Sequence, residues 1–266
     1  MKKLDNTDIS IFSLAMAFLM LLYPVILSYV FNLKIIKDSL ISVLRMTVQL
    51  FIMSLILAFL FEINNIWINI GWIIFMIIFA AIRVIQTSKL KMKKFVIPVF
   101  SALLITSFIV LLYFNYVILR LSNVFEARYF IVIGGMLLGN SLTGNIIGIG
   151  NFYKDIKRNK ERYLFNLGNG ATIYEAAMPY FRNAIISALK PTIASMATIG
   201  IVYLPGMMTG QILGGANPQT AIKYQIAIML AILLSVSLSV TLTIIFTIKS
   251  SFDEYGIIKD DVFQQS

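Results

Sequence analysis

The sequence contains no cysteine and no histidine. Disulfide bonds, thiolate or imidazole metal ligands, and catalysis by cysteine or histidine are therefore excluded within this chain. Charged residues are also scarce, at 13% of the chain, whereas a typical soluble domain has about a quarter. This composition argues against a soluble domain.

The sequence is instead rich in long apolar runs. Hydrophobic residues make up 59% of the 266 residues, and they gather in runs that reach the ~20 residues needed to cross a bilayer as a helix. We predict an all-α polytopic membrane protein, a single transmembrane domain over residues 1–266 that forms a bundle of about seven transmembrane helices with one long helical loop in the cytoplasm. The predicted spans are 9–31, 40–61, 66–86, 95–118, 129–150, 191–214 and 221–248.

The net charge of +10 is explained by membrane topology, because the sequence carries no nucleic-acid-binding module. Most lysines and arginines lie in the connections near residues 34–37 and 83–94, in the segment 151–190, and in the tail after residue 248. Basic loops of polytopic proteins stay in the cytoplasm. We therefore predict a multi-pass protein of the plasma membrane with its N-terminus outside and its C-terminus in the cytoplasm.

The segment 151–190 is the long connection between apolar runs. Its first part predicts that the fifth span continues as a helix out of the membrane and ends where glycines appear. Thr172 and Glu175 then stand at the T-x-x-E spacing of a capping box, which predicts the start of a short helix. Pro179 is expected to end that helix and begin the next, and Pro191 to open the sixth span.

The short capped helix would expose Tyr174, Ala176, Ala177 and Met178 beside one carboxylate. Such a surface suits docking into a groove of another protein. It equally suits an amphipathic elbow that lies on the lipid surface. The glycine breaks around the helix favour docking, because a helix on the lipid surface does not need them.

Polar side chains inside the predicted spans are the candidates for a pathway or gate, because polar groups in lipid are costly. Arg45 can either snorkel to the cytoplasmic surface or act at the mouth of a pathway. Ser141 and Asn145 should face the interior of the bundle. The pathway or gating candidates are Arg45, Gln49, Asn140, Met207, Met208, Thr209 and Gln211.

Glycines with a spacing of four residues predict close helix packing in two spans. Gly206, Gly210 and Gly214 form one such face in the sixth span, and Gly135, Gly139 and Thr143 form another in the fifth. The packing partner is either the same bundle or a second copy of the chain. Pro205, at the start of the first face, predicts a kink.

The side chains available inside the spans assign no metal site. Iron usually takes carboxylate, imidazole or thiolate ligands, and the acidic residue closest to a span interior, Glu62, lies at an outer edge. Met207 and Met208 offer thioethers to a soft metal. Methionine is abundant in this chain, and most of it serves as apolar filling.

Four stretches carry a resemblance to a known family. They are "RMTVQL" (45–50), "GGMLLGNSLTG" (134–144), "GATIYEA" (170–176) and "LPGMMTGQILGGANPQTAIKYQI" (204–226). In these stretches the chain resembles the FetB/YbbM-type permeases, the membrane subunits of a small ABC transporter family linked to iron export. The family is also similar to a plant membrane subunit linked to aluminium tolerance.

The resemblance implies a permease subunit that is not itself an enzyme and that exports a metal or a metal-linked solute. A separate ATPase subunit would bind ATP and Mg²⁺, since the sequence has no G-x-x-x-x-G-K-[ST] phosphate loop. That ATPase would dock on the coupling segment 170–181, and the permease would form a homodimer in the lipid bilayer. The implied coupling residues are Gly170, Thr172, Tyr174, Glu175, Ala176, Ala177, Pro179 and Phe181.

Two other classes of function remain open from the residues alone. A secondary transporter would couple transport to an ion gradient, and such proteins usually carry buried acidic residues and internal repeats. The sequence shows neither feature. A seven-span receptor or assembly scaffold would also fit an external N-terminus, and the segment 151–190 would be its partner site.

Overall fold

The computed structural model describes residues 9–253, 255–259 and 262–263, and these residues are helical with a few isolated β-bridges. The fold class predicted from the sequence, all-α, is confirmed for this part of the chain. In chain order the elements are α1 (Ile11–Ala17), the 3₁₀ turn η1 (Phe18–Leu21), α2 (Leu22–Val30), α3 (Ile36–Ile63), α4 (Ile66–Thr87), α5 (Met92–Tyr113), the π-helical turn η2 (Phe114–Ile118), α6 (Ala127–Arg158), α7 (Lys160–Gly168), α8 (Ile173–Thr198), α9 (Gly206–Leu213) and α10 (Pro218–Ser251).

Among the described residues, six helical stretches are long and apolar enough to cross a membrane. They are Ile11–Val30, Ile36–Ile63, Ile66–Thr87, Met92–Ile118, Ala127–Arg158 and Pro218–Ser251. Each overlaps one of the predicted spans. The chain is therefore a multi-pass membrane protein.

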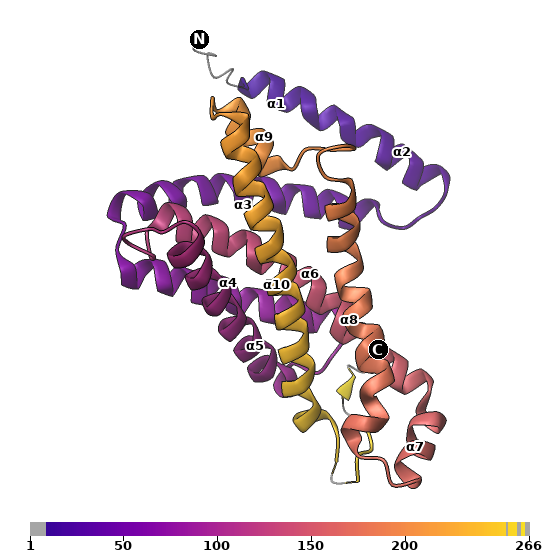
Figure 1. Cartoon of the computed structure of the whole chain (residues 1–266). Helices are drawn as coiled ribbons and strands as arrows, with labels where there is room; N and C mark the ends of the chain where they lie inside the picture. The colour runs from indigo at the N-terminus through magenta and orange to yellow at the C-terminus, as the bar shows by residue number, and fades with distance from the viewer. Residues whose placement is uncertain (1–8, 254, 260–261, 264–266) are drawn as a thin grey trace.

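The core of the bundle is formed by α4, α5, α6, α8 and α10 (Figure 1). At its centre α6 and α10 run in the same direction. The hydroxyl oxygens of Ser141 and Ser235 lie 2.8 Å apart, and those of Tyr153 and Ser251 lie 2.6 Å apart. Since both partners advance together along the sequence, the two helices are parallel.

Close approach of α6 to α10 depends on two glycines that the spacing analysis did not select. A Cβ atom on Gly144 would stand 2.5 Å from Cγ1 of Val236, and one on Gly148 would stand 2.5 Å from Cγ1 of Val240. In contrast, a Cβ atom at Gly139 would meet nothing within 4 Å. Of the glycines predicted to pack in the fifth span, Gly135 does so, since a Cβ atom there would stand 3.2 Å from Cε of Met76, whereas Gly139 does not.

The first three helices lie apart from this core. Only 6% of the apolar window of Ile11–Val30, and the same share of that of α3, is buried in the single chain. Figure 1 shows α1 and α2 running diagonally across one end of the molecule. The side chain of Asn64, at the end of α3, accepts a 2.8 Å hydrogen bond from the backbone N–H of Ala127, which joins α3 to the start of α6.

Helix α8 contradicts the breaks predicted at two prolines. It runs from Ile173 to Thr198 without interruption, with Pro179 and Pro191 inside it. A proline inside a helix costs ~3 kcal/mol or more. Packing of α8 on the core outweighs that cost, because Ala184 and Ala188 are fully buried there.

The predicted sixth span, residues 191–214, is also not one helix. The chain leaves the helical conformation after Thr198 and resumes it at Gly206, so that α8 and α9 are separated by a break over residues 199–205. Pro205 is the residue before α9 rather than a kink within a continuous helix. The break lies where three glycines and a proline within a dozen residues weaken the helix.

Three basic segments come together at one end of the bundle. The backbone N–H of Lys91, in the connection between α4 and α5, donates to the carbonyl of Val262 in the tail at 3.0 Å. The hydroxyl of Tyr163 in α7 donates to the carbonyl of Gly256 at 2.8 Å. Figure 1 shows α7 at this end. The contacts agree with the prediction that these segments share one side of the membrane.

Candidate functional site

The start of α8 has the capping box expected from the sequence. The backbone N–H of Thr172 donates to Oε2 of Glu175 at 2.8 Å, and the backbone N–H of Glu175 donates to Oγ1 of Thr172 at 3.3 Å. Gly170 precedes the cap with φ of +89°, a conformation that suits glycine. Two hydrogen bonds from Thr172 hold the pKa of Glu175 below its ordinary value. The one from the backbone N–H has the larger effect, and the one from the hydroxyl has the smaller.

The exposed surface of the first turns of α8 differs from the predicted one. Tyr174 is 52% exposed and Met178 is 41% exposed. Ala176 and Ala177, which were expected beside them on the surface, are 1% and 2% exposed and belong to the hydrophobic core. Helical geometry explains the difference, since residues four apart share a face and the two alanines lie on the other one.

Two further coupling candidates, Pro179 and Phe181, lie next to this surface. Pro179 is exposed, and Phe181 is half-buried against the core. Next to them lies a polar notch of 390 Å³ between α6, α7 and α8, which sequence reasoning missed. Its charged lining residues are Asp155, Arg158 and Arg162. The notch could not be inferred from one helix, because three helices contribute to it.

Loss of the cap has a measurable consequence at the start of α8. Replacing an N-cap threonine by alanine costs ~0.5–2 kcal/mol, so Thr172→Ala should speed backbone amide exchange at residues 173–176. Thr198→Ala, at the other end of α8, is the control. Exchange at 173–176 that is equal in the two variants would contradict the capping role.

The same cap is expected to weaken in acid. A carboxylate whose pKa is lowered in the folded state contributes stability above its unfolded pKa and loses it as the pH falls through the folded one. For Glu175 the loss therefore begins below the ordinary pKa of glutamate, about 4.3. Amide exchange at residues 173–176 should rise in that range, and less so in Glu175→Gln.

A second candidate site lies at the side of the bundle, between α6, α8, α10 and the break before α9. It is a pocket of 230 Å³. Its polar lining residues are Asn140, Thr143, Thr192, Ser195 and Tyr203. Of these, Asn140 was among the predicted pathway residues. The others carry hydroxyl groups and were not among the predicted pathway residues.

The other predicted pathway residues do not line this pocket. Arg45 and Gln49 lie on an exposed face of α3. Met207, Met208, Thr209 and Gln211 are half-buried in α9. The hydroxyl of Thr209 donates to the carbonyl of Pro205 at 3.0 Å, which satisfies it within its own helix. The structure therefore brings Asn140 together with hydroxyl groups and leaves the remaining candidates elsewhere.

Buried polar side chains of α6 form hydrogen bonds with α10. Nδ2 of Asn145 donates to Oγ of Ser239 at 2.9 Å and to the carbonyl of Ser141 at 2.8 Å. Ser141 and Asn145 are both fully buried, as predicted. They join two parallel helices and lie outside the residues that line the pocket.

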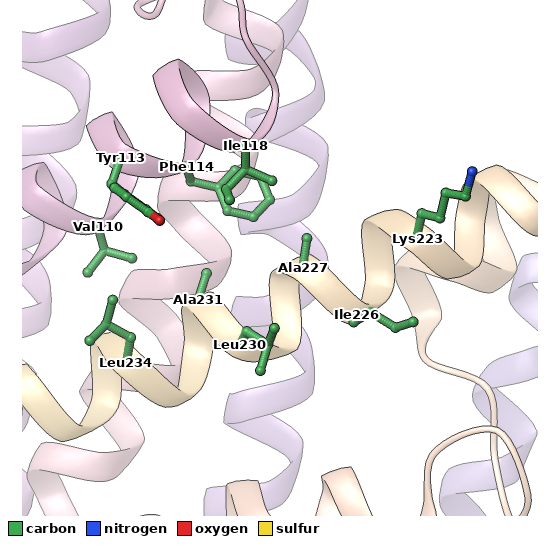
Figure 2. Close-up of a pocket in the computed structure, with 10 residues that line it drawn as sticks. All are labelled: Val110, Tyr113, Phe114, Ile118, Lys223, Ile226, Ala227, Leu230, Ala231 and Leu234. Atoms are coloured by element: carbon green, nitrogen blue, oxygen red, sulfur yellow. The ribbon is translucent and has the colours of Figure 1, made fainter.

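A larger groove of 450 Å³ lies between α5, η2 and α10. Figure 2 shows Val110, Tyr113 and Phe114 facing Ala227 and Ala231 across it, with Lys223 further along α10. The groove is lined almost entirely by apolar side chains. Such a surface suits hydrocarbon, so the smaller polar pocket is the better candidate for a hydrophilic solute.

The described part of the chain is an all-helical multi-pass bundle with a polar pocket among its helices. Residues 11–252 match the family described as "Uncharacterised protein family (UPF0014)". The chain belongs to this family. No solved structure matches it.

Relatives from three organisms show the same relationship. The chain is 35% identical to Protein ALUMINUM SENSITIVE 3 of Arabidopsis thaliana over 81% of this chain and 77% of that protein. It is 32% identical to the Probable iron export permease protein FetB of Escherichia coli over 85% of each chain. It is 31% identical to the UPF0014 membrane protein YjkA of Bacillus subtilis over 82% of this chain and 85% of that protein. The resemblance drawn from the four sequence stretches is confirmed.

Proposed function

We propose that the chain is the membrane permease subunit of an ABC-type transporter that exports a metal ion. The observation that carries this proposal is the continuity of α8 (Ile173–Thr198). One helix joins the exposed surface of Tyr174 and Met178 to Thr192 and Ser195 of the polar pocket. From residue 174 to 195 a helix extends about 30 Å at ~1.5 Å per residue. A displacement of the exposed end of α8 is therefore transmitted to the end that lines the polar pocket.

The coupling segment 170–181 is the proposed docking site for a separate ATPase subunit, which binds ATP and Mg²⁺. Its surface offers an aromatic ring and a thioether side chain beside the carboxylate of Glu175, and the capping box fixes their direction. A helix presented in this way suits a groove on a partner. Export of a metal is proposed from similarity to the probable iron export permease.

Seven passages through the membrane fit the connectivity better than six. Because α6 and α10 are parallel neighbours, the chain between Arg158 and Pro218 has to return across the bundle. The broken pair α8–α9 supplies that return. With the basic end of the bundle in the cytoplasm, an odd number of passages leaves the N-terminus outside.

A homodimer is the proposed assembly in the membrane. The exposed face of α3 carries Arg45 and Gln49, for which the structure gives no hydrogen-bond or ion-pair partner in the described part of the chain. An arginine facing lipid is costly, so coverage of this face by a second copy would stabilise it. The second copy would also provide the second half of the transport unit.

The proposal is tested by purification and flux. The tagged chain, extracted from native membranes, should co-purify with a protein that contains a phosphate loop and hydrolyses ATP. In vesicles that contain both proteins, metal efflux should require ATP. Metal flux in vesicles that lack both ATP and the ATPase would instead indicate a secondary transporter, and would contradict the proposal.

A further inference from the structure

The polar pocket between α6, α8 and α10 contains a distinctive set of groups. The side chains of Asn140, Thr143, Thr192, Ser195 and Tyr203 contribute one amide and four hydroxyls. All of these groups are uncharged at neutral pH, and each contains an oxygen that can accept a hydrogen bond. No lysine, arginine, aspartate or glutamate lines the pocket.

The pocket lies partway along α6 and α10 and is open at one side, where Thr143 and Tyr203 are exposed. Asn140 stands about 20 Å along α6 from Ala127, and Met229, on the facing wall, stands about 16 Å along α10 from Pro218, at ~1.5 Å per residue. The hydrocarbon core of a bilayer is ~30 Å thick. The pocket therefore lies near the middle of the membrane.

The break between α8 and α9 forms part of the pocket wall. Tyr203 and Pro205, from the broken segment 199–205, form part of its wall. Non-helical backbone at membrane depth is tolerated where it is buried in protein or borders a water-filled cavity. Ile201 is 90% exposed in the single chain, so protein of the same chain does not cover the segment.

The pocket has room for several water molecules. Each water molecule occupies ~30 Å³ in the liquid, so 230 Å³ holds about seven. A metal ion with an octahedral shell of six waters takes up a similar volume. Small hard cations release such waters reluctantly and usually keep several of them when bound to protein.

From this geometry we infer that the pocket binds the transported metal ion as its hydrated complex, through hydrogen bonds from metal-bound water to neutral oxygen atoms. The inference rests on the proposed function. Water bound to a metal ion is a strong hydrogen-bond donor because the ion withdraws electrons from it. The amide oxygen of Asn140 and the hydroxyl oxygens of Ser195 and Thr192 would accept these hydrogen bonds.

Weak binding of this kind suits transport. A dehydrated metal ion held by carboxylates or thiolates is released slowly, whereas conduction requires a site that the ion can also leave. An outer-sphere complex gives up no metal–water bond on entry or on exit. The pocket would thus recognise the size and charge of the hydrated ion and discriminate little between metals of equal charge.

Hexaamminecobalt(III) is the probe for this inference, because its six ammine ligands do not exchange and resemble a hydrated ion in size. The permease, purified without any ATPase in nanodiscs of phosphatidylcholine, should bind it saturably in a calorimetric titration. Asn140→Leu and Ser195→Ala should each weaken binding, and together by at least tenfold. Thr198→Val is the matched control, since its hydroxyl donates only to carbonyls of its own helix, at 3.0 Å and 3.3 Å.

Two results would overturn the inference. Saturable binding of Mn²⁺ without competition by hexaamminecobalt(III) would show that the metal ion is bound directly by protein atoms. Equal affinity of the wild type and the Asn140→Leu, Ser195→Ala double variant would show that the complex binds elsewhere. Since the titration contains no ATPase, its outcome is independent of coupling, and a failure of the proposed function is seen separately in the flux assay.

Discussion

Replacement of Tyr174 and Met178 by glutamate is expected to reduce ATP-driven transport at least tenfold. Both side chains are large, apolar and exposed at the start of α8. Full burial of one such side chain contributes ~1.5–3 kcal/mol, and each 1.4 kcal/mol changes an affinity about tenfold. Two buried carboxylates would add a desolvation penalty. The double glutamate variant should therefore lower the affinity for the ATPase by more than removal of the two side chains would.

The control for this double variant is Lys154→Glu. Lys154 is exposed near the C-terminal end of α6, and its change to glutamate alters the net charge by the same two charges. The measurements are co-purification of the ATPase and its ATP hydrolysis in the presence of each permease. If the double variant retains both at the level of Lys154→Glu, the surface of α8 is not the coupling site.

Addition of a single methyl group to Gly148 should destabilise the bundle by ~1–3 kcal/mol, the usual cost of overpacking a core. The new Cβ atom would stand 2.5 Å from Cγ1 of Val240 and 3.4 Å from Cβ of Ala188, between α10 and α8. Helix α10 cannot move away without disturbing the hydrogen bonds that join it to α6. Thermal unfolding in detergent measures the effect.

Two further variants separate this clash from the general effect of replacing glycine. Gly139→Ala adds a methyl group to the same helix where nothing lies within 4 Å, and it should be stabilising by ~0.8–1 kcal/mol through helix propensity. The pair Gly148→Ala and Val240→Ala removes the clashing Cγ1 atom and should recover part of the lost stability. Equal effects of Gly148→Ala and Gly139→Ala would disprove the close packing.

The spans and the capping box could be predicted because they depend on neighbours in the sequence. A membrane-spanning helix satisfies its own backbone hydrogen bonds, so its length and hydropathy identify it. Thr172 and Glu175 form their reciprocal hydrogen bonds across three residues, within the same turn. Burial of Ser141 and Asn145 followed from the cost of polar groups in lipid.

The errors arise where distant helices decide the outcome. Pro179 and Pro191 lie inside α8 because this helix packs on the core, which a local rule for proline does not include. Ala176 and Ala177 resemble surface residues in the sequence, yet neighbouring helices cover them. Gly148 rather than Gly139 is the packing glycine, since the position of Val240 is fixed by the register of α10.

The sequence by itself therefore determined an all-helical membrane protein of the permease class, with a capped helix at its basic end. Only the tertiary structure decided that this helix continues to the centre of the bundle, and that Asn140 meets Ser195 and Tyr203 there in one pocket. The physical reason is the range of the interactions. Hydropathy and capping act within a helix, whereas a pocket and a mechanical connection require side chains that are brought together by packing between helices.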